Sequence, residues 1–233
     1  MGHTLRYLAN DLLDLIYPRV CAGCTHGVPV RGEIFCMRCL GELPETGFHL
    51  VEDNPFEQQF WGRVPVQTGA AMYYFIPHGI TQVLLHNIKY RGRSDFGRFV
   101  GKMYGSALRA TPRFAQVDSI VPVPLHWRKR RKRGFNQSSM FAQGLAESLE
   151  IEVIEGCLIR HQSTRSLTNM ARHERVRSIS KAFSVKGPEV VAGRCVLLVD
   201  DVLTTGATLE ACALRLTEAG ALVSMATIAC GRI

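Results

Sequence analysis

Apolar residues along this chain alternate between short continuous runs and longer segments with helical spacing. Three segments have the continuous apolar character that is typical of strands: 66–76, 117–123 and 196–199. Three others repeat apolar residues at the spacing of a helix: 78–90, 94–110 and 136–149. Strands and helices that alternate in this way predict an α/β fold, in which helices cover both faces of a mostly parallel sheet.

The last predicted strand leads directly into a segment with several carboxylate and hydroxyl side chains. Asp200 and Asp201 follow it, at the carboxyl end of a strand, where open α/β sheets bind their ligands. Hydroxyls, a glycine and the free amides of a helix start can cradle one phosphate, and these residues are Thr204, Thr205, Gly206, Ala207 and Thr208. A sugar with a 5-phosphate and free hydroxyls fits both parts of this segment. The turn would hold the phosphate, and the carboxylates would face the hydroxyls or a hydrated Mg²⁺. A strand–turn–helix with a solvated acidic corner is the alternative.

Several common sequence signals are missing. The chain contains neither G-x-x-x-x-G-K-[ST] nor G-x-G-x-x-G, which disfavours ATP-dependent and dinucleotide chemistry. It has no run of 18 apolar residues, so we expect no membrane span. The apolar pattern of residues 4–17 suits an amphipathic helix better than a signal peptide, so the cytoplasm is the expected compartment.

Four of the eight cysteines form two C-x₂-C pairs that are separated by eleven residues. Each pair can present two thiolates to one ion, so the group predicts a structural Zn²⁺ site without an open coordination position. The ligands would be Cys21, Cys24, Cys36 and Cys39. Free thiols packed as small apolar residues, or a redox-active pair, are the alternatives. The zinc module could also be a docking surface for a protein partner.

Positive charge is concentrated in two segments of a chain whose formal net charge is +8. Residues 89–133 contain thirteen Lys and Arg against two acids, and residues 157–181 contain six against one. Six cations are consecutive: Arg128, Lys129, Arg130, Arg131, Lys132 and Arg133. This run predicts a solvated, self-repelling loop or a surface for a polyanion, either a pyrophosphate-bearing substrate or nucleic acid. In the second segment, Arg172 and Arg175 would share one helix face.

Composition divides the chain into three parts. Residues 1–43 would hold the amphipathic helix and the zinc module. Residues 44–65 contain three prolines and two glycines and have the character of a linker. Residues 66–233 contain the alternating strands and helices, so we expect them to form one α/β domain.

The segment 195–208 resembles the fingerprint of type I phosphoribosyltransferases, which bind 5-phosphoribosyl 1-pyrophosphate (PRPP). Nearly the whole chain resembles the ComF/GntX-type competence family of bacteria. The resemblance includes the cysteine pairs and the segments 86–92, 121–126 and 133–137. It implies a type I phosphoribosyltransferase-like sheet with a four-cysteine zinc finger, PRPP with Mg²⁺ as the ligand, and a role in handling single-stranded DNA during transformation.

The resemblance also implies roles for individual residues. In a transferase, Asp200 and Asp201 would orient the ribose hydroxyls, and the turn 204–208 would hold the 5-phosphate. The candidates for the pyrophosphate are His126, Arg128 and Lys129. In a protein that binds single-stranded DNA, the nucleic-acid candidates are Arg130, Arg131, Lys132, Arg133, Arg172 and Arg175. The acceptor of a transfer reaction has no recognisable signal in the sequence.

Overall fold

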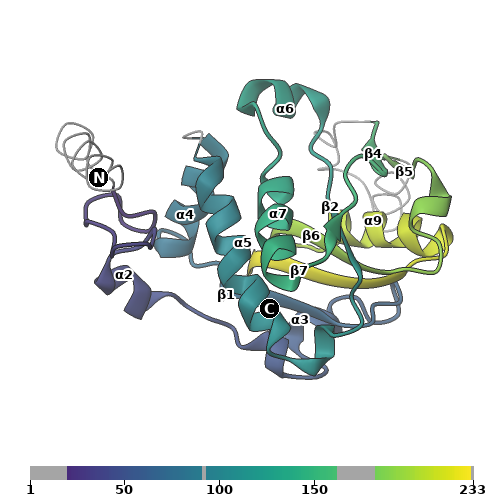
Figure 1. The fold of residues 1–233 in the computed structure, drawn as a ribbon, viewed down its shortest axis with the longest axis horizontal. Coiled ribbons are helices and arrows are strands. Elements are labelled where there is room, and N and C mark those ends of the chain that lie inside the picture. Colours follow the sequence, from purple (N-terminus) through teal and green to yellow (C-terminus); the bar gives the residue numbers. More distant parts are fainter. Residues whose placement is uncertain (1–19, 91–92, 162–181, 232–233) are drawn as a thin grey trace, which may run out of the picture.

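The computed structural model describes residues 20–90, 93–161 and 182–231 (Figure 1). The elements in chain order are α2 (Met37–Glu42), α3 (Pro55–Gln58), β1 (Gly69–Tyr74), α4 (Ile80–Tyr90), α5 (Ser94–Arg109), β2 (Ser119–Pro122), α6 (Trp127–Arg133), α7 (Gln137–Leu149), β3 (Glu152–Val153), β4 (Leu158–Arg160), β5 (Phe183–Val185), β6 (Cys195–Leu203), α9 (Ala207–Glu218) and β7 (Leu222–Cys230). The predicted helix 4–17 and the candidates Arg172 and Arg175 lie outside the described residues.

Five strands form one parallel sheet in the order β1-β7-β6-β2-β3. β6 lies in the middle, and residues 196–199 are fully buried because paired strands flank them and helices cover both faces. The predicted strand 196–199 is confirmed, but β6 continues to Leu203, so Asp200 still pairs in register with Thr227 of β7. Since the strands are parallel, their carboxyl ends lie at one edge of the sheet.

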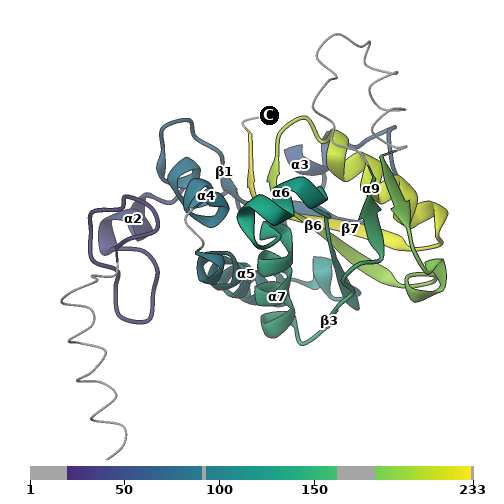
Figure 2. The same cartoon turned by 90° about the horizontal axis from the view of Figure 1, so that it is seen from above.

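Helices cover the two faces of this sheet, with α5 and α7 on one side and α9 on the other (Figure 2). The α5–α7 contact is a contact between backbones. A Cβ on Gly144 would lie 2.0 Å from the carbonyl oxygen of Arg98, and one on Gly101 would lie 2.3 Å from that of Phe141. Only glycine permits this approach. The contact fixes the position of α7, whose first turn reaches the end of β6.

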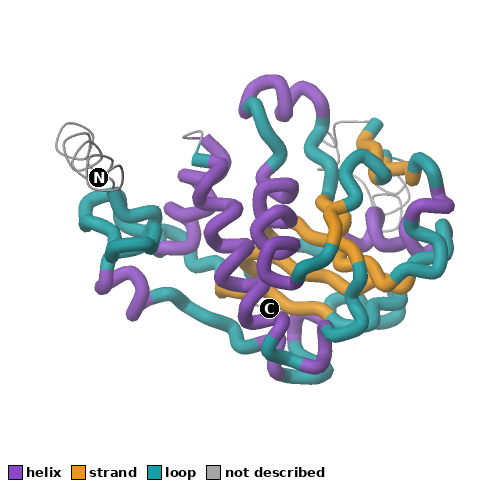
Figure 3. Tube along the Cα trace, viewed as in Figure 1, coloured by secondary structure: helices purple, strands orange, loops and turns teal. Residues whose placement is uncertain are grey.

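The six consecutive cations form a helix and not the loop that their mutual repulsion predicted. α6 lies between two loops in Figure 3, over the sheet edge described above. Arg and Lys are good helix formers, and both ends of α6 are satisfied. His126 caps the start by accepting from the Arg128 amide, and Gly134, with φ +83°, ends the helix by donating to the Arg130 carbonyl.

The cysteine pairs and α2 lie at one end of the molecule, beside α4, in both views (Figures 1 and 2). Within the stretch predicted as a linker, Phe48, Phe56 and Phe60 are buried in the same core as the sheet. The domain boundaries stay a prediction. Among the described residues, no helix combines the length and apolar character that a membrane span requires.

Candidate functional site

Two adjacent carboxylates lie at the carboxyl edge of the sheet, and the start of α7 contacts one of them. Oδ1 of Asp200 accepts hydrogen bonds from the Ser138 hydroxyl and from the Asp201 amide, both at 2.8 Å. Burial, and then the charge of Asp201, raises the pKa of Asp200 to about 7. This carboxyl is therefore costly to ionise in the ligand-free protein, and a cation or a hydroxyl donor would stabilise its charged form.

Lys89, in the last turn of α4, supplies a cation to the pair. Its Nζ lies 2.7 Å from Oδ2 of Asp201, and the two side chains are 22% and 14% exposed. An ion pair this far from bulk water is screened less than one on the surface. Sequence reasoning gave Lys89 no role, because only the folded chain brings residue 89 to residue 201.

A cavity of about 160 Å³ opens in front of the carboxylates. Its polar and charged lining residues are Lys89, Lys129, Arg133, Asn136, Gln137, Ser138, Arg160, Asp200, Asp201 and Thr208. Four of them are cations that come from α4, α6 and β4. A cavity with two carboxylates on one wall and several cations on the others suits a ligand that carries both hydroxyls and strongly anionic groups.

The turn between β6 and α9 forms a second, smaller cavity that shares Asp200 and Thr208 with the first. It measures about 40 Å³ and is lined by residues 202–209 and Asp200. Gly206 has φ +76°, and a Cβ there would lie 3.2 Å from the ring of Phe60, so the turn needs glycine. Gly206 also precedes α9 without a side-chain cap in the described chain, which leaves the first amides of that helix for an anion.

The first turn of α7 contains a buried side-chain amide whose hydrogen-bond donor has no acceptor among the described residues. Gln137 is 2% exposed, and its Oε1 accepts a hydrogen bond from Arg133 Nη1 at 2.9 Å. Its Nε2 is buried and has no hydrogen-bond partner among the described residues. A buried amide without a partner is unfavourable, so this donor at the cavity wall is suited to a ligand acceptor. Gln137 lies in the resembling segment 133–137, but the sequence analysis assigned it no role.

Asn136 occupies the N-cap position of α7, but it does not cap the helix with its side chain in the described structure. Its Nδ2 instead donates to the carbonyl oxygen of Val123 at 3.0 Å. This bond ties the start of α7 to the end of β2. Like α9, α7 therefore directs amides without a side-chain cap toward the edge of the sheet where Asp200 lies.

The structure separates the cations predicted for pyrophosphate. Lys129 lines the cavity, whereas His126 and Arg128 do not. His126 is buried and accepts the Arg128 amide at 3.3 Å through Nδ1. The Arg128 guanidinium lies 5.1 Å from the centre of the Trp127 ring, which is 57% exposed.

Among the nucleic-acid candidates that the structure describes, only Arg133 lines this cavity. The other three have exposed side chains on α6: Arg130, Arg131 and Lys132. Arg160 of β4 is, like Lys89, a cation that was not among the candidates, and it lines the cavity within electrostatic reach of Asp200.

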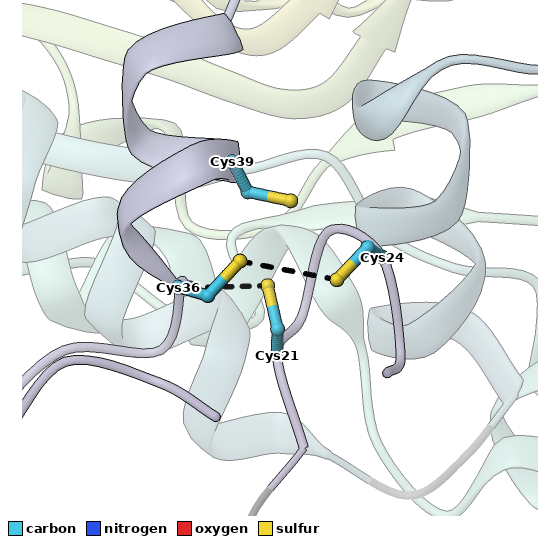
Figure 4. Close-up of side chains that lie close together, drawn as sticks. All are labelled: Cys21, Cys24, Cys36 and Cys39. Carbon is cyan, nitrogen blue, oxygen red and sulfur yellow. Dashed lines mark hydrogen bonds between the residues drawn. The ribbon is translucent and has the colours of Figure 1, made fainter. Parts of the chain in front are cut away.

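The four grouped cysteines point toward a common centre (Figure 4). Their sulfur atoms all lie within 4.8 Å of one another, and those of Cys24 and Cys36 are 3.9 Å apart. Tetrahedral zinc with Zn–S bonds of about 2.3 Å requires sulfur atoms about 3.8 Å apart. The cluster could therefore hold a metal ion such as zinc.

Backbone amides around the cluster favour its thiolate form. The Cys36 amide donates to Cys21 Sγ at 3.2 Å, and the Gly27 amide donates to Cys24 Sγ at 3.3 Å. The amides of His26 and Gly27 lower the pKa of Cys24 to about 6. Cys39 is different, since burial raises the pKa of its thiol. The donor set fits a closed site of four sulfur ligands, which leaves no position for a substrate.

Comparison with known proteins gives the family. The chain is 31% identical over 220 residues to the DNA utilization protein YhgH of Escherichia coli strain K12, which covers 93% of this chain and 92% of that protein. This chain belongs to the family of YhgH and competence protein F. Competence protein F of Haemophilus influenzae is 26% identical over 196 residues, with 82% of this chain and 81% of that protein covered.

Residues 136–232 of the chain also match the family model of the phosphoribosyl transferase domain. The matched range contains the start of α7, Asp200 and the turn into α9, whereas the cysteine cluster and Lys89 precede it. The glutamine PRPP amidotransferase of B. subtilis is a similar solved structure, with a TM-score of 0.42 and 24% identity, covering 62% of this chain and 30% of that one.

Proposed function

We propose that the cavity at the end of β6 binds PRPP together with Mg²⁺, and that the protein transfers the phosphoribosyl group to an acceptor. One observation carries this proposal: the phosphate-sized cavity at 202–209 and the larger cavity with four cations meet at Asp200 and Thr208. PRPP has this sequence of groups, because its ribose separates a single phosphate from a diphosphate. The match of residues 136–232 to a phosphoribosyl transferase domain supports the same ligand.

Each part of PRPP then has its own group of residues in the two cavities. The hydroxyls and amides of 204–208 hold the 5-phosphate, and Asp200 and Asp201 accept hydrogen bonds from the ribose hydroxyls. Lys129, with the other cations of the cavity, faces the diphosphate. When the nucleophile of the acceptor attacks C1, the bond from C1 to the diphosphate breaks and pyrophosphate leaves with the electron pair. Fixed cations stabilise the negative charge that grows on it, and a bound Mg²⁺ would neutralise a further part of that charge.

Calorimetric titration with PRPP and Mg²⁺ tests the assignment. Asp200→Asn and Asp201→Asn should each weaken binding about ten- to a hundredfold, since hydrogen bonds to charged groups contribute about 1.5–3 kcal/mol. Asp53→Asn is the matched control, because Asp53 is exposed and lines neither cavity. If both carboxylate variants bind PRPP as the wild type does, the ribose assignment is wrong.

A second function has its own observation, the exposed cations of α6 beside the 57% exposed ring of Trp127. We propose that this helix binds the backbone of single-stranded DNA, with Trp127 stacking on a base. The names of the relatives, DNA utilization protein and competence protein, agree with it. Neutralising about five phosphates predicts a log–log salt slope of about −3.5. An affinity that does not change with salt would exclude this surface.

We also propose that the cysteine cluster binds zinc. Four thiolates favour zinc over the hard cations Mg²⁺ and Ca²⁺, which prefer oxygen ligands. Metal analysis of the purified protein should find one zinc ion per chain, and Cys21→Ser should lose it. A purified, folded wild-type protein without zinc would exclude this assignment.

A further inference from the structure

The loop between Cys21 and Cys24 packs directly on α4 at two points. Near the carboxyl end of the helix, Asn87 Nδ2 donates a hydrogen bond to the Ala22 carbonyl oxygen at 2.9 Å, and Asn87 is 3% exposed. Near the amino end, a Cβ on Gly23 would lie 2.7 Å from Cγ2 of Ile80. The two contacts are seven residues, or about 10 Å, apart along the helix. They therefore restrain both its position and its tilt.

The position of Ala22 depends in turn on the cysteine cluster. Ala22 follows Cys21, and the Cys21 sulfur accepts hydrogen bonds from the amides of Gly23 at 3.3 Å and Cys36 at 3.2 Å. A metal ion at the four sulfurs would hold both cysteine pairs at fixed distances from each other. The carbonyl oxygen that Asn87 contacts would then be fixed by the metal.

The carboxyl end of the same helix enters the candidate PRPP site. Lys89 lies two residues after Asn87, and its Nζ is 2.7 Å from Oδ2 of Asp201. A helix transmits a displacement along its axis because its backbone is hydrogen-bonded throughout. Leu84 and Ile88 also hold α4 against the core, so loss of the cysteine contacts would shift the helix and not release it.

We propose that the cysteine module holds α4 in place through its contacts with Asn87 and Ile80, a role that we call the brace. The brace positions Lys89 in the phosphosugar site, and metal loading thereby sets the affinity for PRPP. The inference rests on the proposed function of the cavity. Without the brace, the Lys89 ammonium is displaced from Asp201, and two adjacent carboxylates face an anionic ligand with less compensation. Asn87 acts through Lys89 and is a positioning residue.

A double-mutant cycle that measures PRPP binding with Mg²⁺ tests whether Asn87 acts through Lys89. In the full-length, zinc-loaded protein, Asn87→Ala should weaken binding about three- to tenfold, which lies within the range expected for coupled neighbours. It should cause no further loss when Lys89→Met is already present. Gln82→Glu, at an exposed position of the same helix, keeps the Oε1 that accepts the His78 amide; it is the matched control and should bind as the wild type does. An unchanged affinity in Asn87→Ala, or an equal loss in both backgrounds, would overturn the proposal.

Removal of the metal provides the second arm. A chelated protein that keeps its circular dichroism spectrum should lose affinity to the same extent as Asn87→Ala, and the variant should lose nothing more on chelation. Undiminished binding by the chelated protein would contradict the brace. If Asn87→Ala does not fold, Ile80→Ala, which removes the other contact, takes its place in the cycle.

Hydrogen exchange separates this proposal from the assignment of PRPP. Amides of 80–89 should exchange faster in Asn87→Ala and in the chelated protein, whereas those of α9 should not change. Should the wild type fail to bind PRPP, the proposed function is wrong, and the exchange pattern alone decides whether the brace exists. Equal exchange in 80–89 with and without metal would exclude it.

Discussion

Replacing Asp200 with Asn should stabilise the ligand-free protein at pH 8 while it weakens the PRPP site. Asn keeps Oδ1, so it can still accept the hydrogen bonds of the Ser138 hydroxyl and the Asp201 amide. It removes the charge that burial and Asp201 disfavour, and these raise the pKa from 3.8 to about 7. At about 1.36 kcal/mol per pKa unit, the shift corresponds to at most about 4 kcal/mol of unfolding free energy.

The direction of the pH dependence follows from the raised pKa. Below pH 3.8 the Asp200 carboxyl is protonated in both the folded and the unfolded chain, so its charge costs nothing. Between this value and about 7, the unfolded chain ionises first, and the stability of the wild type falls as the pH rises. Above about pH 7 the full cost is present. The advantage of Asp200→Asn should therefore be larger at pH 8 than at pH 5.

Urea unfolding at these two pH values measures the difference. A gain of 1 kcal/mol raises the melting temperature of a chain of this size by about 2–4 °C, so thermal unfolding gives an independent check. Asp53→Asn is again the control, because Asp53 is exposed and its φ of +51° is tolerated by Asn. The reasoning is refuted if Asp200→Asn is no more stable than the wild type at pH 8, or if its advantage does not depend on pH.

Two further predictions concern the start and the middle of α7. Gln137→Glu keeps an acceptor for Arg133 but removes the unmatched donor. It should weaken PRPP binding by about tenfold and leave the binding of ribose 5-phosphate, which lacks the diphosphate, unchanged. Equal losses for both ligands would show that Gln137 does not contact the diphosphate. Gly144→Ala should lower the unfolding free energy by about 1–3 kcal/mol or more, because its Cβ would lie 2.0 Å from the Arg98 carbonyl oxygen. Gly41→Ala, with nothing within 4 Å, should not, and urea unfolding compares the two.

Local signals were sufficient for the frame of the molecule. The apolar run 196–199 forms the central strand, and the helices predicted over 78–90, 94–110 and 136–149 correspond to α4, α5 and α7. The C-x₂-C spacing predicted the cluster because two close thiols in each pair restrict where their sulfur atoms can lie. The turn 204–208 could be recognised since all its chemistry lies within five consecutive residues.

The remainder of the site depends on contacts between distant segments. Lys89 and Asp201 are separated by more than a hundred residues, so no local pattern relates them. The role of Gln137 is visible only when its amide is seen to be buried without a partner. For α6, mutual repulsion of the cations suggested a loop, but intrinsic helix propensity and the two caps at His126 and Gly134 outweigh it.

A crystal structure of the zinc-loaded protein with PRPP and Mg²⁺ tests the central claim most directly. The account predicts the 5-phosphate in the turn 204–208, the ribose hydroxyls at Asp200 and Asp201, and the diphosphate beside Gln137 and Lys129. A ligand that binds elsewhere, for example along the outer face of α6, would contradict it. A site that stays empty at saturating PRPP would do the same.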